Sequence, residues 1–507
     1  MNSLGQRAIG DIDDRARNEA RLAWWIAFGV VWFALALQAM VLARFTLAHP
    51  IDDAAFFFRY AENLAHGLGY RFNPTEPPVW GATAPLWPLV LATGVRAGLT
   101  MEQSAGFFSW MFTLSAVGLL TFLVLRMRGI VAGLAFACIA ALDTRMIYWD
   151  VSGMETPLGY AIVALGLAAI GQRRLGASLG VAVGLALVHK IDFIPFAMLL
   201  VAAAWFEGGR LPRRALAVAA LIAIAWYGFA WLHFGSVVPN SVLVKVFTRH
   251  APLPATWFVD RAFVPGTGPV LVLLAVFGIP ELWRTQRGVL LCALGFILVH
   301  CVVYSLAPAS EDWAWYAAPL QPCLCLLAAV GAADSFERLA AWPALRARAR
   351  WIRFGVPGGL VAAVLAVPLT REALTFKYPP SSDIVESTRV ASGRWIDSHA
   401  PPDWKVLSHS GNPLYYARRY SIDSTNLNRK EHVGEEQLRS TYDPEVVVKT
   451  QSEFSAPRAA YVAHPRFRVA RIFARHDARV DAYTVVEIRG DLPRLIGEDG
   501  GADVEFY

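Results

Sequence analysis

Two adjacent carboxylates, Asp52 and Asp53, are the residues of this chain best suited to chemistry. They follow the first long apolar run and begin the polar and aromatic stretch Ile51–Pro74. An ionised side chain near a bilayer is costly to place and tends to mark function. One carboxylate can act as a general base on an acceptor hydroxyl while the other orients that hydroxyl or binds a cation such as Ca²⁺ or Mg²⁺. The structural alternative is that both acids only cap the following helix and meet its dipole.

Cations that could bind phosphate occur at the same membrane face. A helix that begins at the aspartates carries Arg59 and Tyr60 about two turns further on, facing roughly the same way. Lys190 and Lys245 are the only lysines before Lys377, and both stand at the ends of apolar runs. A lysine there can bind phosphate as a point charge, or it can snorkel to lipid headgroups. These residues are therefore candidates for holding a phosphate.

Other polar residues each carry a functional and a structural interpretation. Glu155 either lines a cleft or supplies the N-terminal acid of a helix. Asp312 and Trp313 either bind sugar, through hydroxyl hydrogen bonds and ring stacking, or anchor the chain at the interface. His409 and the other histidines are more often structural than catalytic, and their scatter gives no metal-ligand spacing.

The elements that must position these residues are membrane helices. Hydrophobic residues make up 56% of the chain, charged residues only 17%, and the mean hydropathy is +0.41. This composition predicts a polytopic α-helical membrane protein. The 5 cysteines lie in apolar runs, which argues against a disulfide framework. The net charge of +6 comes largely from arginines at one membrane face, so nucleic acid is not an expected partner.

Apolar runs of spanning length predict about eleven membrane helices. The expected spans are 22–43, 104–125, 130–142, 156–171, 175–188, 193–206, 215–232, 268–279, 289–306, 316–333 and 354–369. With the N-terminus inside, arginines fall in every inner loop and the candidate site residues share the outer face. The run Thr83–Leu99 contains Pro85, Pro88 and Arg96, so we interpret it as an interfacial or re-entrant helix with Trp87 at the interface.

The chain changes character after the last apolar run. Residues 1–370 are predicted to form the membrane domain, with a first outer loop at 45–103, and residues 371–507 a separate soluble domain on the outer face. Strand-like runs and a helical stretch predict a small α/β module. The expected strands are Lys405–Ser410, Ala459–His464, Val469–Ala474 and Asp481–Ile488, with a helix near Ile384–Ser398.

The run DDAAFFFRYAENLAHGLGYRFNPTEPPVWGATAPLW (Asp52–Trp87) resembles the first outer loop of the bacterial polyprenyl-phosphate-dependent glycosyltransferases of the GT-C fold. It is most similar to the group that includes the mycobacterial terminal arabinofuranosyltransferase. Later segments fit in the same order: Asp143 with Ser152–Thr156, His233–Lys245, Glu311–Tyr316 and Ser408–Asn428. The chain departs from the family at Trp80–Ala82, where an acid-Gly-Tyr triplet is usual, at His189–Asp192 and at Ala317–Ala318.

The resemblance implies an enzyme of the bacterial inner membrane that acts on its outer side. The loop arginines predict a cytoplasmic N-terminus and a periplasmic C-terminal domain. The enzyme would move a sugar, arabinofuranose by resemblance, from a polyprenyl-phosphate donor to a glycan or protein acceptor. Asp53 or Asp52 would be the catalytic base, and Lys245, Lys190 and Arg59 would bind the donor phosphate. Sugar or acceptor contacts are expected at Tyr60, Trp80, Glu155, Asn240, Asp312, Trp313 and His409.

Other classes of function stay open on the sequence. Acids and cations at membrane level also suit an ion-coupled transporter, although here they cluster at one face and no repeat relates the halves. A receptor or scaffold could use the outer domain for binding, but it would not need an aromatic-rich first loop with paired acids. A ligase or polymerase that uses a lipid-diphosphate glycan would need more cations than this face carries.

Overall fold

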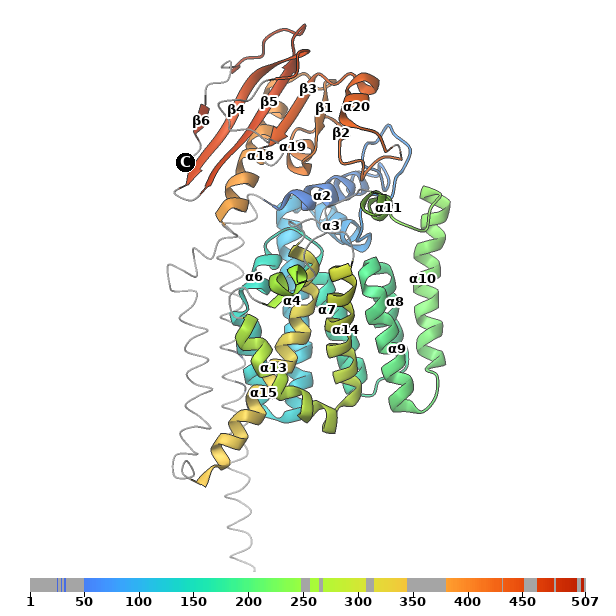
Figure 1. The fold of residues 1–507 in the computed structure, drawn as a ribbon. Helices are drawn as coiled ribbons and strands as arrows, with labels where there is room; N and C mark the ends of the chain where they lie inside the picture. The colour runs from blue at the N-terminus through green and yellow to red at the C-terminus, as the bar shows by residue number, and fades with distance from the viewer. Residues whose placement is uncertain are drawn as a thin grey trace, which may run out of the picture.

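The computed structural model describes residues 25, 29, 32, 50–247, 256–263, 268–306, 314–343, 380–430, 432–450, 463–477, 480–498 and 503–505. Figure 1 shows a bundle of helices beneath a sheet domain, with the helix α2 (Asp52–Ala65) between them. The predicted span 354–369, the domain boundary at 370 and the residues Asp312 and Trp313 lie outside the described residues. So do nearly all of the predicted span 22–43 and most of the predicted strand Ala459–His464.

Apolar helices build the bundle, and every predicted span within the described residues coincides with one of them. Six of the described helical segments are long and apolar enough to cross a membrane. Shorter apolar helices complete the bundle, so the number of crossings stays a prediction. The bundle helices are α4 (Met101–Arg128), α5 (Ile130–Leu142), α7 (Thr156–Gly171), α8 (Ala177–His189), α9 (Ile194–Gly208), α10 (Arg213–Phe234), α13 (Gly268–Thr285), α14 (Arg287–Leu306) and α15 (Gln321–Ala341).

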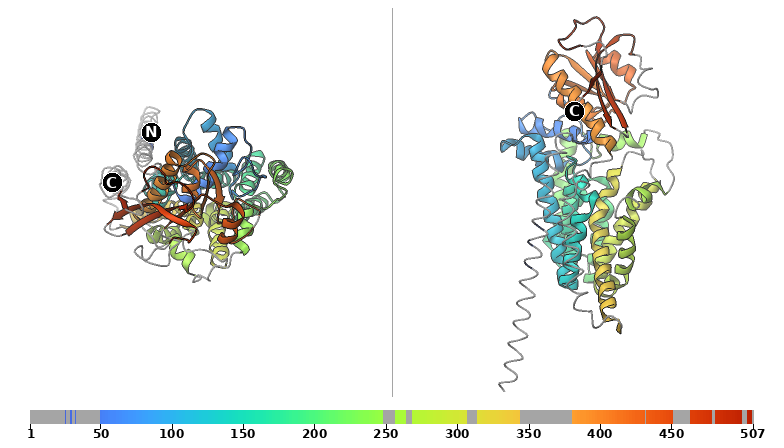
Figure 2. Two further views of the ribbon diagram at one scale, coloured as in Figure 1. Left: turned by 90° about the horizontal axis from the view of Figure 1, so that it is seen from above. Right: turned by 90° about the vertical axis from the view of Figure 1, so that its left-hand side faces the viewer.

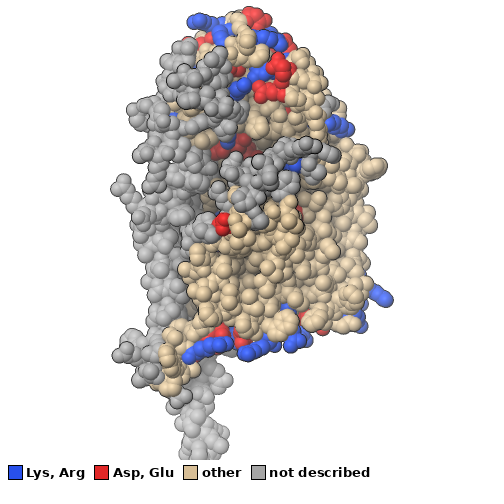
Figure 3. All heavy atoms as spheres, viewed as in Figure 1, with Lys and Arg blue, Asp and Glu red and all other residues tan. Residues whose placement is uncertain are grey.

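Burial separates central from peripheral helices. The most apolar window of the segment Trp315–Leu339, which covers most of α15, is 94% buried, whereas that of α10 is only 22% buried. α10 exposes Leu221, Ile224 and Leu232, as a helix that contacts lipid does. Figure 3 shows a broad uncharged belt between arginine-rich loops at one end of the bundle and the charged sheet domain at the other. This distribution is that of a membrane protein.

Short helices lie across the end of the bundle under the sheet domain (Figure 1). They are α2 (Asp52–Ala65), α3 (Leu86–Arg96), α6 (Thr144–Asp150), α11 (Asn240–Phe247), α12 (Trp257–Phe263), η1 (Ile191–Phe193) and η2 (Ala314–Leu320). The predicted helix in Thr83–Leu99 is α3, but the interfacial place expected for Trp87 is wrong. The Trp87 side chain is fully buried, and its indole donates a hydrogen bond to the Gly153 carbonyl at 2.9 Å, because α3 packs against α2 and α4.

The C-terminal domain is a mixed sheet covered by helices (Figure 2). The strand order is β2-β1-β3-β5-β4-β6, in which β2, β1 and β3 run parallel and β5 pairs antiparallel with β3 and β4. Three predicted strands and the predicted helix are present, while β2, β3 and β6 were not predicted. The elements are α18 (Pro380–His399), β1 (Lys405–Ser408), α19 (Gly411–Tyr416), β2 (Tyr420–Asp423), α20 (Glu435–Tyr442), β3 (Val446–Thr450), β4 (Phe467–Asp477), β5 (Val480–Arg489) and β6 (Asp503–Glu505).

Candidate functional site

The first turn of α2 sends its two aspartates to different neighbours. Neither side chain caps α2. Asp52 Oδ1 accepts a hydrogen bond from the Asn412 backbone amide at 3.0 Å, and Asp52 Oδ2 lies 3.9 Å from Arg389. Asn412 stands in the first turn of α19, where amides lack partners within the helix. Asp52 therefore satisfies an amide of the C-terminal domain instead of one in its own helix.

Arg59 lies two turns after Asp52 and also faces the C-terminal domain. Its guanidinium donates to the carbonyls of Phe72, at 3.2 Å, and Arg419, at 2.9 Å. The side chain is buried, and the structure does not bring it to the pocket that contains Asp53. Asp52 and Arg59 thus form one stripe of α2 that docks the C-terminal domain.

Asp53 faces a small pocket that lies between α2, the ends of the bundle helices and the C-terminal domain. The pocket gathers residues from seven separate segments of the chain. They are Asp53, Phe56, Phe57, Gly81, Ala82, Thr83, Met154, Glu155, Lys190, Ser241, Lys245, Trp315, Leu427 and Asn428. Four residues that the sequence analysis placed at one membrane face line this pocket together: Asp53, Glu155, Lys190 and Lys245.

The two lysines of the pocket share a tyrosine. Lys190 Nζ pairs with Glu155 Oε1 at 2.8 Å, with both side chains buried, and lies 4.7 Å from the centre of the Tyr316 ring. Lys245 Nζ donates to the Tyr316 hydroxyl at 3.0 Å. The resulting cluster places two positive charges and the carboxylates of Asp53 and Glu155 around one small space.

Burial and neighbouring charges shift the pKa values of Asp53 and Lys245. Removal from bulk water raises the pKa of Asp53, and the neighbouring acids Asp52 and Glu155 add to this, while Lys245 and Lys190 oppose it. Burial lowers the pKa of Lys245, but Tyr316 and Asp53 outweigh it, so the net pKa of Lys245 is raised and the ammonium is retained. A carboxylate with a raised pKa beside a stable cation suits proton transfer from a hydroxyl next to a bound anion.

Tyr60 and Trp80 support the pocket wall without lining it. The Tyr60 hydroxyl donates to the Val79 carbonyl at 2.8 Å and accepts from the Gly81 amide at 3.1 Å. The Trp80 indole donates to the Ala82 carbonyl at 2.8 Å. Both side chains are buried. They fix the segment at 81–82, which forms part of the wall.

Asn240 holds the loop that closes the pocket from the side of the C-terminal domain. Its Nδ2 lies within hydrogen-bond distance of the carbonyls of Asn426, Leu427 and Arg429, at 2.9, 3.0 and 2.6 Å. Its own backbone amide donates to the Trp80 carbonyl at 2.7 Å. Asn240 is thus a tether and not a pocket residue. His409 is exposed and does not line the pocket.

Ser241, Leu427 and Asn428 are pocket residues that the site prediction missed. Ser241 precedes Lys245 by one helical turn, a spacing that could have indicated a shared face. The other two lie more than 370 residues after Asp53 in sequence, and only the resemblance of Ser408–Asn428 pointed to that region. No local pattern brings such distant residues together, because the docking of two domains does so.

The described part of the chain contains no group of three or more His, Cys, Asp or Glu side chains able to hold a metal ion. The two acids that line the pocket, Asp53 and Glu155, are accompanied there by two lysines. These ammonium groups already provide positive charge beside the carboxylates.

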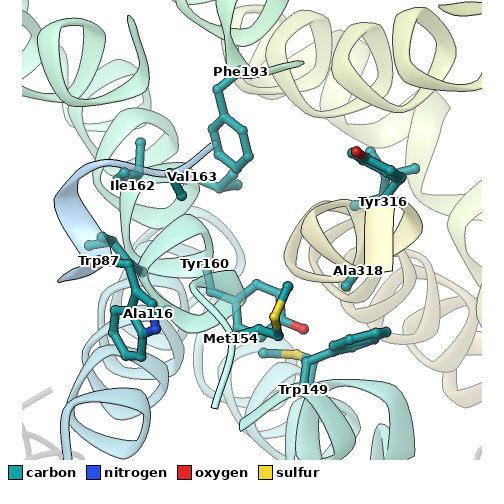
Figure 4. Close-up of a cluster of buried hydrophobic side chains, with 14 of the residues drawn as sticks. Trp87, Ala116, Trp149, Met154, Tyr160, Ile162, Val163, Phe193, Tyr316 and Ala318 are labelled. Atoms are coloured by element: carbon teal, nitrogen blue, oxygen red, sulfur yellow. The ribbon is translucent and has the colours of Figure 1, made fainter. Parts of the chain in front are cut away.

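The pocket rests directly on the packed core of the bundle. Figure 4 shows Met154 and Tyr316 together with Tyr160, Phe193 and Trp149 in one buried cluster. Met154 and Tyr160 are almost fully buried. Because a close-packed core resists displacement, it holds Tyr316, and through it the two lysines, in a fixed position.

Comparison with known proteins finds similar solved structures but no similar sequence. No protein-family model matches the chain, and no curated protein sequence matches it. ArnT from Cupriavidus metallidurans in the apo state superposes with a TM-score of 0.63 at 15% identity, covering 92% of this chain and 98% of that one. ArnT bound to undecaprenyl phosphate gives 0.62 at 16% identity, covering 91% and 98%.

A more distant match is the Archaeoglobus fulgidus oligosaccharyltransferase tethered with an acceptor peptide containing the NVT sequon. It superposes with a TM-score of 0.51 at 12% identity, covering 83% of this chain and 69% of that one. These likenesses show that the chain has the GT-C fold, as the sequence predicted. The protein is a membrane protein of this fold with a C-terminal sheet domain.

Proposed function

We propose that the protein is a glycosyltransferase that moves a sugar from a polyprenyl-phosphate donor to a hydroxyl of a glycan or protein acceptor. The observation that carries the proposal is the pocket in which Asp53 meets Lys245 and Lys190 at the end of a GT-C bundle. ArnT of the same fold binds undecaprenyl phosphate, and the oligosaccharyltransferase carries an acceptor peptide, which supports a lipid-linked donor and a separate acceptor.

In the proposed reaction the acceptor oxygen forms a bond to the anomeric carbon of the sugar. The bond from that carbon to the phosphate oxygen breaks, and the polyprenyl phosphate leaves with the bonding electrons. Asp53 takes the hydroxyl proton, for which its raised pKa is favourable. Lys245 and Lys190 stabilise the phosphate charge that develops on the leaving group. Asp52 and Arg59 act indirectly, by holding α2 against the C-terminal domain.

The proposed location is the outer face of the bacterial inner membrane. The end of the bundle opposite the pocket is rich in arginine (Figure 3), which supports a cytoplasmic place for that end under the positive-inside rule. The pocket and the C-terminal domain are then periplasmic. Arabinofuranose is the first sugar we propose, on the resemblance of Asp52–Trp87 alone.

The test is sugar transfer in membranes from cells that express the full chain. A panel of radiolabelled polyprenyl-phosphate sugars, arabinofuranose among them, is supplied with native acceptors, and the Asp53→Asn variant is the control. We expect transfer from one donor and its loss in the variant. Absence of transfer from every donor by a folded, inserted protein would contradict the proposal and favour a lipid-diphosphate glycan or a transported ion as the substrate.

A further inference from the structure

Two buried polar atoms of the pocket have no role in the steps described above. Ser241 and Asn428 are 2% and 4% exposed, and both line the pocket. Ser241 Oγ and Asn428 Oδ1 have no hydrogen-bond partner among the residues that the structure describes. A buried polar atom without a partner destabilises the fold, because it has lost its hydrogen bonds to water without replacing them. Such atoms at a binding pocket point to a ligand that supplies the missing hydrogen bonds.

The position of Ser241 on α11 favours a ligand contact. Ser241 is the second residue of α11, so the helix offers its hydroxyl no carbonyl one turn earlier, and the hydroxyl has no partner within the described structure. Lys245 follows four residues later and lines the same pocket. One face of α11 therefore presents a hydroxyl and an ammonium to one bound molecule.

Asn428 presents an acceptor whose orientation is fixed. Its Nδ2 donates to Asp423 Oδ2 at 2.9 Å, and its backbone amide donates to the same oxygen at 3.1 Å. Because a carboxylate acts here as acceptor, the other amide atom, Oδ1, must be the one that faces Gly81. A Cβ added to Gly81 would lie 2.1 Å from that oxygen. Glycine thus leaves just enough room for Asn428 to reach the pocket.

Two of the unpartnered atoms are acceptors that are unsuited to bind phosphate. Asn428 Oδ1 and the second oxygen of Glu155, Oε2, are both buried acceptors without a partner within the described structure. The terminal oxygens of an ionised phosphate are acceptors too, so they would repel these atoms. A sugar hydroxyl can donate a hydrogen bond to either of these acceptors, and it can also accept one from the hydroxyl of Ser241.

We propose that Ser241 and Asn428 form a subsite that recognises hydroxyl groups of the transferred sugar and thereby helps to set sugar specificity. This inference rests on the proposed function. It assigns the phosphate to the lysines and the sugar to the serine and the asparagine, so the C-terminal domain supplies part of the catalytic pocket. A site built to bond hydroxyls rejects analogues that lack them, because its own polar atoms are then left unpaired.

The test measures lipid binding by the full-length protein in nanodiscs. The probes are undecaprenyl phosphate and its arabinofuranosyl, ribofuranosyl, glucosyl, galactosyl and mannosyl derivatives. The variant is Ser241→Ala, which removes a hydroxyl that bonds none of the described residues. The matched control is Ser109→Ala, because Ser109 is also buried and its hydroxyl also lacks a partner in the described chain, but it does not line the pocket.

We expect Ser241→Ala to weaken binding of the tightest glycosylated lipid by about two- to tenfold. Its affinity for undecaprenyl phosphate and its thermal unfolding temperature should stay unchanged. Ser109→Ala should change neither lipid affinity. Asn428→Ala, measured with the same lipids, should also reduce the preference for the glycosylated lipid over the bare one.

Several results would overturn the inference while leaving the proposed function intact. One is undecaprenyl phosphate binding with no gain from any sugar. Another is an equal effect of Ser241→Ala on the bare and the glycosylated lipids, or no effect on either. Failure of the wild-type protein to bind any of these lipids would instead contradict the proposed function, and the subsite with it.

Discussion

Replacing Asp53 by asparagine tests the proposed base directly. Asparagine keeps the shape of the side chain but cannot take a proton. A positioned general base contributes about 10²- to 10⁴-fold to a rate, so kcat should fall by that factor, about 3–5 kcal/mol in activation free energy. Donor KM should not rise, because Lys245 loses a competing carboxylate and remains available to the phosphate. The pKa of Asp53 is raised, so kcat/KM of the wild type should decline as the pH falls through that pKa.

The matched variant is Asp52→Asn, at the neighbouring position of the same helix. A carboxamide oxygen can still accept from the Asn412 amide. The variant loses the attraction to Arg389 at 3.9 Å and the contribution of Asp52 to the raised pKa of Asp53. The expected loss in kcat is less than about tenfold, given the modest strength of most partly exposed ion pairs. The assay is single-turnover transfer from the labelled donor in nanodiscs, at several pH values.

The result that would refute this reasoning is a simple one. If Asp53→Asn transferred sugar within about threefold of the wild type, no proton transfer to Asp53 could limit the reaction. If Asp52→Asn lost as much activity as Asp53→Asn while remaining folded, the division of the two aspartates between docking and catalysis would be wrong.

Three further predictions follow from the contacts around the pocket. Lys190→Met should destabilise the fold by about 3–5 kcal/mol, because it leaves the carboxylate of Glu155 buried without its ion-pair partner. In thermal unfolding, the double variant with Glu155→Gln should recover much of the lost stability. Gly81→Ala should slow transfer strongly because its Cβ would displace the loop at 427–428. Gly434→Ala is the control, because Gly434 stands at an open position with φ −68°, and it should transfer sugar at the wild-type rate. Equal transfer rates of the two variants would contradict this prediction. Burial raises the pKa of Glu386 from 4.5 to about 7. As the pH rises between these values, Glu386 loses its proton in the unfolded chain but keeps it in the folded one, so the free energy of unfolding should fall. Thermal unfolding of Glu386→Gln in detergent should not show this pH dependence.

The sequence predicted the helices well because hydrophobicity alone specifies them. The runs 130–142 and 156–171 match α5 and α7 residue for residue, since a bilayer requires long apolar segments with satisfied backbones. Trp87 was misplaced for a related reason. An aromatic residue in a short apolar helix fits an interface, yet here its indole finds a carbonyl inside the protein, and no sequence pattern distinguishes the two environments.

The candidate site was predictable in its charges but not in its geometry. Placing Asp53, Lys190 and Lys245 at one face needed only span counting and loop charge. The sequence could not tell which aspartate faces the pocket and which faces the C-terminal domain. Successive helical residues point about 100° apart, and polar neighbours lie in both directions, so only the three-dimensional structure distinguishes Asp53 from Asp52. Arg59 shows the same limit: spacing put it near the aspartates, and the structure turned it toward the C-terminal domain.

The C-terminal domain contributes to the pocket through the topology of its sheet. β1 and β2 are parallel neighbours, so their carboxyl ends meet at one edge. The segment after β1 leads into α19, whose Asn412 amide binds Asp52, and the segment after β2 carries Asn428 into the pocket. One sheet edge thus orients α2 through one loop and forms part of the pocket through the next. Because Asp52 and Asp53 are consecutive residues of one helix, any shift of the domain that moves Asp52 must also move the proposed base.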